Sequence, residues 1–195
     1  NWQHSIYVGT FLVQDGSKKE FQFRIAKNAY GDWYIHNIRQ YLDLTTECPV
    51  PINIPSDPGK VGKATLTGID SDGDGVRDDV QRYIASTYPC SEKTRAALTQ
   101  FAKALQVTLL DSNDKEASIR HAQERLDALH CLDYLSETEQ AKTIFEELRA
   151  EILNTEERLR MYFIADNHLG GQVFFSPQES ELKSKCAFNP DDMKN

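Results

Sequence analysis

The stretch that joins the two halves of this chain reads Asp70-Ser71-Asp72-Gly73-Asp74-Gly75-Val76-Arg77-Asp78-Asp79. Carboxylates stand at its first, third, fifth and ninth positions, and glycine stands at the sixth. Calcium prefers six to eight hard oxygen ligands at roughly 2.3–2.6 Å, and alternating aspartates supply them from one tight turn. Gly75 permits the backbone reversal that such a turn needs, because it lacks a Cβ. The pattern therefore predicts a Ca²⁺ site rather than a solvated acidic loop.

The candidate ligands of this ion are Asp70, Asp72, Asp74, the carbonyl of Val76, Asp78, Asp79 and Gln81. The twelfth position of an EF-hand loop is normally a bidentate glutamate, whereas Gln81 offers a single amide oxygen. The last ligand is therefore open between Asp78, Asp79 and a carboxylate from elsewhere in the chain. The helix that enters an EF-hand is also missing, since residues 63–68 have the composition of extended chain or turn. The loop resembles the wider D-x-D-x-D-G group, which includes thrombospondin type 3 repeats, and a single site is expected because the pattern occurs once.

Length, charge and hydropathy limit what this protein can be. The 195 residues are enough for one or two small domains with a core. A net charge of -8 argues against nucleic acid or an anionic membrane surface as a partner. The mean hydropathy of -0.56 fits a soluble globular chain. No apolar run approaches the roughly 18–20 residues that cross a bilayer.

Four widely spaced cysteines favour an exported protein with two disulfides. None forms a C-x-x-C pair, so zinc-ribbon spacing is absent. Four free thiols in a cytosolic protein are the alternative, but a lone calcium loop suits millimolar extracellular calcium. We therefore expect a periplasmic or extracellular location. The chain begins at Asn1 without a signal peptide, which we interpret as a mature, processed or truncated form. Of three connectivities we favour Cys90–Cys131 and Cys48–Cys186.

The first part of the chain has strand composition. Residues 4–13, 20–25 and 33–39 are separated by turn signals, and the last two alternate polar and apolar residues. They predict a three-stranded antiparallel meander whose core side chains are Phe21, Phe23, Ile25, Trp33, Ile35 and Ile38. Three such strands need a cover from elsewhere. The segment resembles the closing strands of nuclear-transport-factor-2-like sheets. Residues 48–58 hold four prolines and predict an extended connector.

From Asp78 onward the apolar residues follow the helical period. Helices are predicted over 78–88, from an N-cap at Ser91 to about 110, over 115–135, after Ser136, and again after a cap or kink at 154–157. The fifth helix is expected to carry Leu159, Tyr162, Phe163 and Asp166 to a stop at Gly170. The fold class predicted is α+β, with a helical bundle of four to five helices. Its parts are a meander (1–47), a connector (48–67), the calcium loop and start of the first helix (68–82), a helical domain (83–172) and an irregular tail (173–195).

Motifs for catalysis are absent from this sequence. It contains no H-E-x-x-H, G-x-S-x-G elbow or P-loop, and none of its five histidines pairs at i, i+4. The acidic pairs at 146–147 and 156–157 lie among cations, and adjacent helical residues do not face one another. The polar run 154–162 suits either a recognition surface or a buried helix with one wet face, and we favour the second. We therefore expect no enzyme activity.

The run from Gly68 to Gln172 resembles a group of uncharacterised exported bacterial proteins that carry a D-x-D-x-D-G loop ahead of a cysteine-bearing helical domain. This resemblance implies calcium and export, and it implies no activity. The function predicted is that of a calcium-stabilised exported protein with a structural or protein-binding role, including self-assembly through the edge of the meander. The alternative is a periplasmic inhibitor or immunity-type protein that blocks a toxin or hydrolase, and an enzyme is the third hypothesis.

Overall fold

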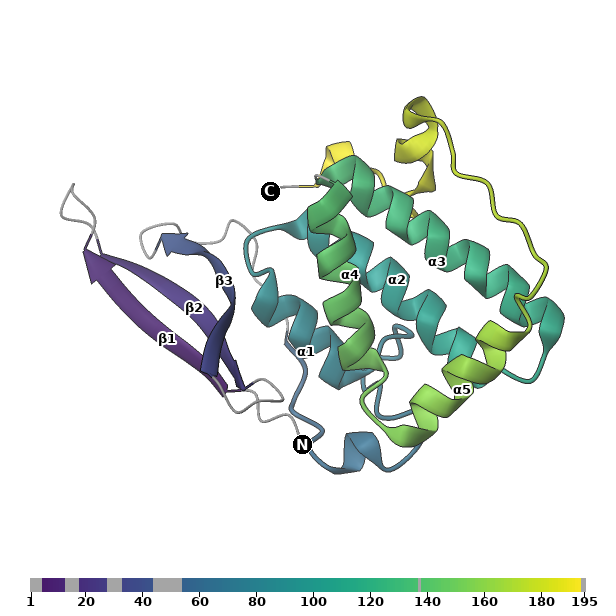
Figure 1. Cartoon of the computed structure of the whole chain (residues 1–195), viewed down its shortest axis with the longest axis horizontal. Helices are drawn as coiled ribbons and strands as arrows, with labels where there is room; N and C mark the ends of the chain where they lie inside the picture. The colour runs from purple at the N-terminus through teal and green to yellow at the C-terminus, as the bar shows by residue number, and fades with distance from the viewer. Residues whose placement is uncertain (1–4, 13–17, 28–32, 44–53, 137, 194–195) are drawn as a thin grey trace. The chain divides into compact units, whose positions relative to one another are not determined.

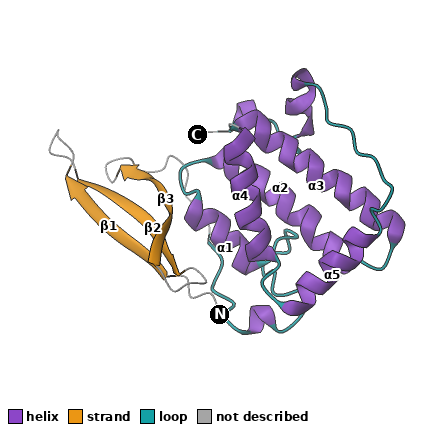
Figure 2. Ribbon diagram, in the orientation of Figure 1, coloured by secondary structure: helices purple, strands orange, loops and turns teal. Residues whose placement is uncertain are grey.

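The chain divides into two units, Asn1–Cys48 and Pro49–Asn195, and each is described by itself. The computed structural model describes residues 5–12, 18–27, 33–43, 54–136 and 138–193, with the side chains of 54–136 and 141–193. Figure 1 labels the elements along the chain, and Figure 2 separates helix from strand.

The first unit contains three strands. They are β1 (Ser5–Leu12), β2 (Lys18–Lys27) and β3 (Trp33–Asp43), antiparallel in the order β1-β2-β3. The pairing of β2 with β3 shifts register between Glu20 and Gln22 and again between Phe23 and Arg24. The predicted core side chains of this segment lie outside the described part of the structure.

Over residues 54–136 and 138–193 the second unit contains five α-helices and three short 3-10 helices, and Figure 1 labels the α-helices. The α-helices are α1 (Asp78–Thr87), α2 (Glu92–Leu110), α3 (Lys115–Leu135), α4 (Thr138–Ile152) and α5 (Glu156–Asn167). The 3-10 helices are η1 (Val61–Lys63), η2 (Glu179–Lys185) and η3 (Pro190–Asp192). None of the described helices has the length and apolar composition to cross a membrane.

The predicted α+β class is wrong for the part of the molecule that holds the described core. Residues 54–136 and 138–193 contain no strand. Every buried hydrophobic side chain of the described part lies at or after Val76. The physical reason is that α1 to α4 each bury an apolar face in one shared core, so these helices cover one another without a sheet. This unit is therefore a helical bundle.

The helix limits predicted from caps and periodicity are confirmed to within one or two residues. The side chain of Ser91 accepts the backbone N–H of Thr94 at 3.2 Å and so caps α2. Thr155 caps α5 in the same way, through the N–H of Arg158. These caps satisfy donors that have no partner inside the helix.

Helix α5 does not bury the stripe that we predicted for it. Leu159 and Phe163 are 41% and 59% exposed, whereas Arg158, Met161 and Ala165 face inward. The side of α5 that faces the core carries Arg158 instead of Leu159 and Phe163. Its guanidinium can be buried there because three backbone carbonyls accept its hydrogen bonds. Three of the twelve residues of α5 are buried, so the choice between a recognition surface and a buried helix with one wet face stays a prediction.

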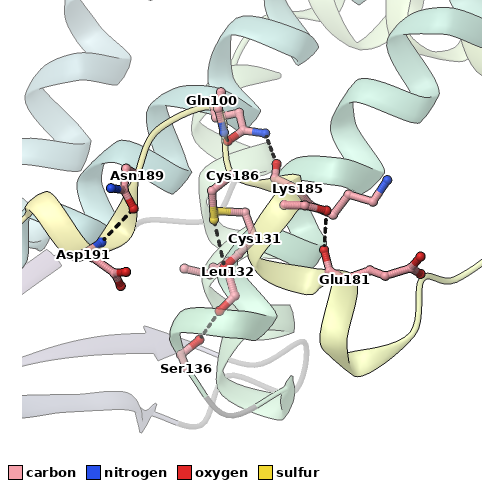
Figure 3. Close-up of a disulfide and its surroundings, with 11 residues drawn as sticks. Gln100, Cys131, Leu132, Ser136, Glu181, Lys185, Cys186, Asn189 and Asp191 are labelled. Atoms are coloured by element: carbon pink, nitrogen blue, oxygen red, sulfur yellow. Dashed lines mark hydrogen bonds between the residues drawn. A yellow bond between two sulfur atoms is a disulfide. The ribbon is translucent and has the colours of Figure 1, made fainter.

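The described disulfide joins Cys131 on α3 to Cys186, just after η2 (Figure 3). Both predicted pairs, Cys90–Cys131 and Cys48–Cys186, are therefore wrong, and Cys90 is disulfide-bonded elsewhere. Gln100 of α2 forms hydrogen bonds with the backbone on both sides of Cys186. Its amide donates to the carbonyl of Lys185 and accepts the N–H of Ala187, both at 2.9 Å. The segment after residue 173 is thus held to α2 and α3 rather than being an irregular tail with one anchor.

Candidate metal centre

Three of the predicted ligands lie together. The carboxylates of Asp70, Asp72 and Asp74 each bring an oxygen to within 4.8 Å of the other two. Like charges this close repel one another unless a cation or hydrogen-bond donors offset them. Among the described residues the cation within ion-pair distance of the cluster is Lys103, whose Nζ lies 3.9 Å from Asp74 and whose side chain is 46% exposed. The cluster can therefore accept a positive ion.

Backbone N–H groups shape the loop around Asp70. Its Oδ1 accepts the N–H of Gly73 at 2.9 Å, and its Oδ2 accepts the N–H of Gly75 at 2.9 Å. Gly73 and Gly75 have φ values of 70° and 89°, which favour glycine. Asp74 accepts the N–H of Val76 at 2.8 Å. The turn is thus folded by the same side chains that would bind the ion.

Gln81 closes one side of the cluster. Its amide nitrogen donates to Oδ2 of Asp72 at 3.0 Å. Its Oε1 is buried and has no hydrogen-bond partner. The hydrogen bond from Gln81 and the backbone N–H of Asp74 hold the pKa of Asp72 below its ordinary value. Gln81 therefore contacts the cluster through its amide nitrogen, and its Oε1 is left without a partner.

Asp78 and Asp79 do not join the cluster, although both were predicted as candidates for the last ligand. Asp78 is buried, and its Oδ1 accepts from the N–H and the hydroxyl of Ser71 at 2.9 and 3.1 Å. The N–H of Asp78 also donates to the carbonyl of Ile69 at 2.8 Å, which closes the base of the loop. Asp79 is held by Arg77. The two carboxylates therefore stabilise the loop rather than line it.

The side chain and the carbonyl of Val76 have different surroundings. Its side chain is 1% exposed and belongs to the core cluster. Its carbonyl accepts no hydrogen bond from a described residue, so it keeps both lone pairs for a ligand. The side chain anchors the end of the loop in the core.

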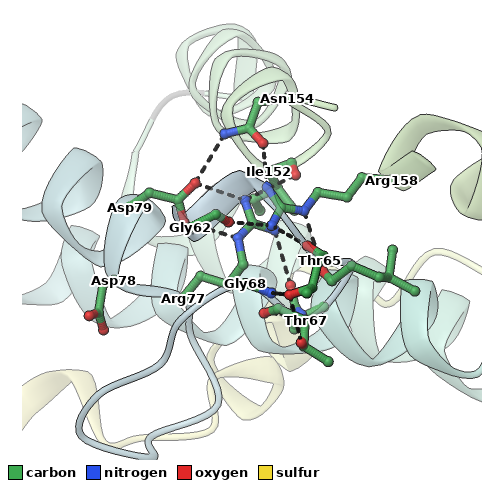
Figure 4. A network of polar contacts seen from close by, with 12 residues as sticks. Gly62, Thr65, Thr67, Gly68, Arg77, Asp78, Asp79, Ile152, Asn154 and Arg158 are labelled. Atoms are coloured by element: carbon green, nitrogen blue, oxygen red, sulfur yellow. Dashed lines mark hydrogen bonds and ion pairs between the residues drawn. The ribbon is translucent and has the colours of Figure 1, made fainter. Parts of the chain in front are cut away.

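Two buried arginines lie beside the loop, Arg77 at its end and Arg158 on α5 (Figure 4). Arg77 is 1% exposed and pairs with Asp79 through Nε at 2.9 Å and through a second nitrogen at 3.2 Å. Arg77 also donates to Gln106 and to the carbonyl of Ile152, both at 3.1 Å. Burial alone would raise the pKa of Asp79, but the hydrogen bond and charge of Arg77 hold it below the ordinary value. Arg77 thus ties the loop to α2 and to the end of α4.

Arg158 ties the connector to α5. It is fully buried and donates to the carbonyls of Gly62, Thr65 and Leu66 at 2.7, 2.9 and 3.3 Å. It also donates to Asn154, which in turn donates to Asp79 at 3.0 Å. Burial lowers the pKa of Arg158, the charge of Arg77 lowers it further, and Asp79 acts in the opposite direction. One network therefore joins the connector, the loop and α5.

The sequence reasoning missed both arginines as structural centres. An arginine beside three acidic residues looks like a surface charge, and Arg158 stands in a helix among exposed glutamates. The one available signal was the dense polar run from Asn154, which begins at the cap of α5 and supplies two members of the network.

No family model, curated protein or solved structure matches this chain. The resemblance to exported proteins with a D-x-D-x-D-G loop stays a prediction.

A substitution at Gly68 would show how tightly the arginine network is packed. It has φ +66°, and a Cβ there would overlap Cδ of Arg77. Gly59 is the matched control, because it has φ +54° and open space around it. We expect Gly59→Ala to cost about 1 kcal/mol of unfolding free energy through the backbone alone. Gly68→Ala should cost about 1–2 kcal/mol more through overpacking. Equal losses in urea unfolding would show that Arg77 can move aside.

Proposed function

We propose that this protein binds one Ca²⁺ ion in the loop from Asp70 to Gln81 and that the ion has a structural role. The observation that carries the proposal is the group of three carboxylates within 4.8 Å of one another, folded by their own backbone contacts. The carbonyl of Val76 and Oε1 of Gln81 are the further oxygens that this loop offers. All are hard ligands of the kind that calcium prefers.

The position of the loop supports a clamp rather than a catalytic metal. Arg158 holds the connector before Asp70 to α5, and Val76 within the loop is buried in the core. Asp78 closes its base, and Arg77 follows the cluster by only three residues. An ion that draws the three carboxylates together would stabilise the start of α1 against the connector. Binding to the folded state alone stabilises that state by mass action.

Calcium is expected to raise the melting temperature of the chelated protein. At a free calcium concentration of 100 times Kd the gain is about 2.7 kcal/mol, or roughly 5–10 °C for a chain of this size. Magnesium should give a smaller shift, because it demands near-ideal octahedral geometry and dehydrates reluctantly. Calorimetry in EGTA, calcium and magnesium measures the three states.

Two variants separate ion binding from general stability. Asp74→Asn keeps an acceptor oxygen for the backbone N–H of Val76 but removes one charge from the cluster. We expect it to abolish the calcium shift while leaving the chelated protein as stable as the parent, since it also removes repulsion. Glu116→Gln, an exposed acidic residue of α3, should keep the full shift. A parent protein that melts at the same temperature in EGTA and in calcium would refute the proposal.

The wider role that we propose is that of an exported protein that binds another protein. The Cys131–Cys186 disulfide supports export, because such bonds persist in oxidising compartments. Phe163, Val173 and Phe175 are 59%, 72% and 83% exposed, and a bound protein would remove their apolar surface from water. No observation on the described residues favours the inhibitor over this role.

A further inference from the structure

A cavity of about 350 Å³ lies between α2, α3, α4 and α5, apart from the candidate metal centre. Its walls are mostly apolar and aromatic, and they include Phe101, Leu105, Leu129, Phe145, Tyr162 and Phe174. Phe101 and Phe145 meet edge to face with ring centroids 4.4 Å apart. The volume falls in the range of small-molecule sites, which is about 300–1,000 Å³. The cavity is therefore large enough for a compact organic ligand.

The charged residues that line this cavity are mostly cations. They are Arg125, Lys142 and Arg149, against one carboxylate, Glu146. None of the three cations forms an ion pair with a described residue. Lys142 and Arg149 are exposed, whereas Arg125 is half-buried. A ligand in the cavity would therefore meet a surplus of positive charge.

Arg125 is held by neutral partners. It donates to the hydroxyl of Thr108 at 2.9 Å, and its guanidinium lies 5.6 Å from the centre of the Tyr162 ring. Burial lowers the pKa of Arg125, Tyr162 and the charge of Asp166 act in the opposite direction, and the charge of Arg149 lowers it. Among the described residues no carboxylate lies within ion-pair distance of this half-buried cation, so its guanidinium can still bind an anion at a site that has already lost part of its water.

We propose that this cavity binds a small amphiphilic carboxylate, with its apolar body among the aromatic walls and its carboxylate at Arg125 and Arg149. The apolar body of such a ligand matches the aromatic walls of the cavity, and its anionic group matches the surplus of cations. This inference is independent of the calcium proposal, since no residue of the loop lines the cavity.

Titration calorimetry with two probes of equal chain length tests the inference. Decanoate, used below the concentration at which it forms micelles, carries the carboxylate, and decan-1-ol lacks it. We expect decanoate to bind with 1:1 stoichiometry and at least tenfold more tightly than decan-1-ol. Equal affinities for the two probes would overturn the proposal.

Substitutions of residues that line the cavity show where the carboxylate and the apolar body of the ligand bind. Arg149→Gln, at an exposed position, and Arg125→Gln should each weaken decanoate about five- to tenfold and leave decan-1-ol unchanged. Arg120→Gln is the matched control, because Arg120 is an exposed cation of α3 that does not line the cavity. Leu126→Trp should fill the cavity and abolish binding of both probes. Binding that survives Leu126→Trp, or a loss in Arg120→Gln equal to that in Arg149→Gln, would overturn the proposal.

Discussion

Replacing Arg158 by methionine is expected to lower the free energy of unfolding by about 3–5 kcal/mol, the range for breaking a buried charge network. Methionine keeps much of the length of the side chain but donates no hydrogen bond. The carbonyls of Gly62, Thr65 and Leu66 would lose their partner inside the protein. Each unsatisfied buried acceptor costs about 1–3 kcal/mol, and partial access of water to the connector reduces the sum. Urea unfolding followed by circular dichroism at 222 nm measures the loss.

Arg160 provides the matched control, because it lies two residues further along α5 and is exposed. Arg160→Met should change stability by less than about 0.5 kcal/mol. Arg158→Lys should recover only a small part of the loss, since one ammonium cannot reach the several acceptors that a planar guanidinium spans. Equal stability of Arg158→Met and Arg160→Met would contradict the role of Arg158 as the anchor of the connector.

Removing the Cys131–Cys186 disulfide is expected to cost about 4 kcal/mol. The two cysteines are 55 residues apart, and the chain-entropy model assigns that loss to a loop of this length. The crosslink acts by restricting the unfolded chain, so the native contacts around Gln100 should persist in the variant. Thermal and urea unfolding of Cys131→Ala combined with Cys186→Ala, in an oxidising buffer, measures the effect.

Cys131 is fully buried, so its replacement by alanine also removes packing. Cys131→Val combined with Cys186→Ala fills the position and isolates the crosslink. The two double variants should agree to within about 1 kcal/mol. A loss below 1 kcal/mol in both would contradict the chain-entropy account, because the hydrogen bonds from Gln100 exist only in the folded state and cannot restrict the unfolded chain.

Short-range patterns were sufficient to predict the helices and the acidic loop. The caps at Ser91 and Thr155 act within three residues, and apolar residues at helical spacing mark each buried face. Asp70, Asp72 and Asp74 lie within one turn of chain, so their proximity follows from the sequence spacing and the glycines between them. These features depend on neighbours along the chain, and a sequence shows neighbours directly.

Long-range partners were not predictable in the same way. Asp79 has the composition of a calcium ligand, but in the folded chain it accepts from Asn154, 75 residues away. Its other partner, Arg77, is in turn held by Gln106 and by the carbonyl of Ile152. The disulfide partner of Cys131 depends on which helix face lies beside residue 186, and four cysteines alone leave three connectivities open. The α+β class was wrong because the pattern in residues 4–39 gave no information on where the core would lie.

Arg158 shows the division most clearly. Its helix could be placed from the cap at Thr155, but its inward direction could not, because a charged side chain is buried only where enough acceptors converge on it. Those acceptors come from residues 62–66, more than ninety positions away in the chain. Spacing along the chain thus determined the helices and the acidic cluster. The folded chain alone determined which polar groups meet, since that depends on contacts between distant segments.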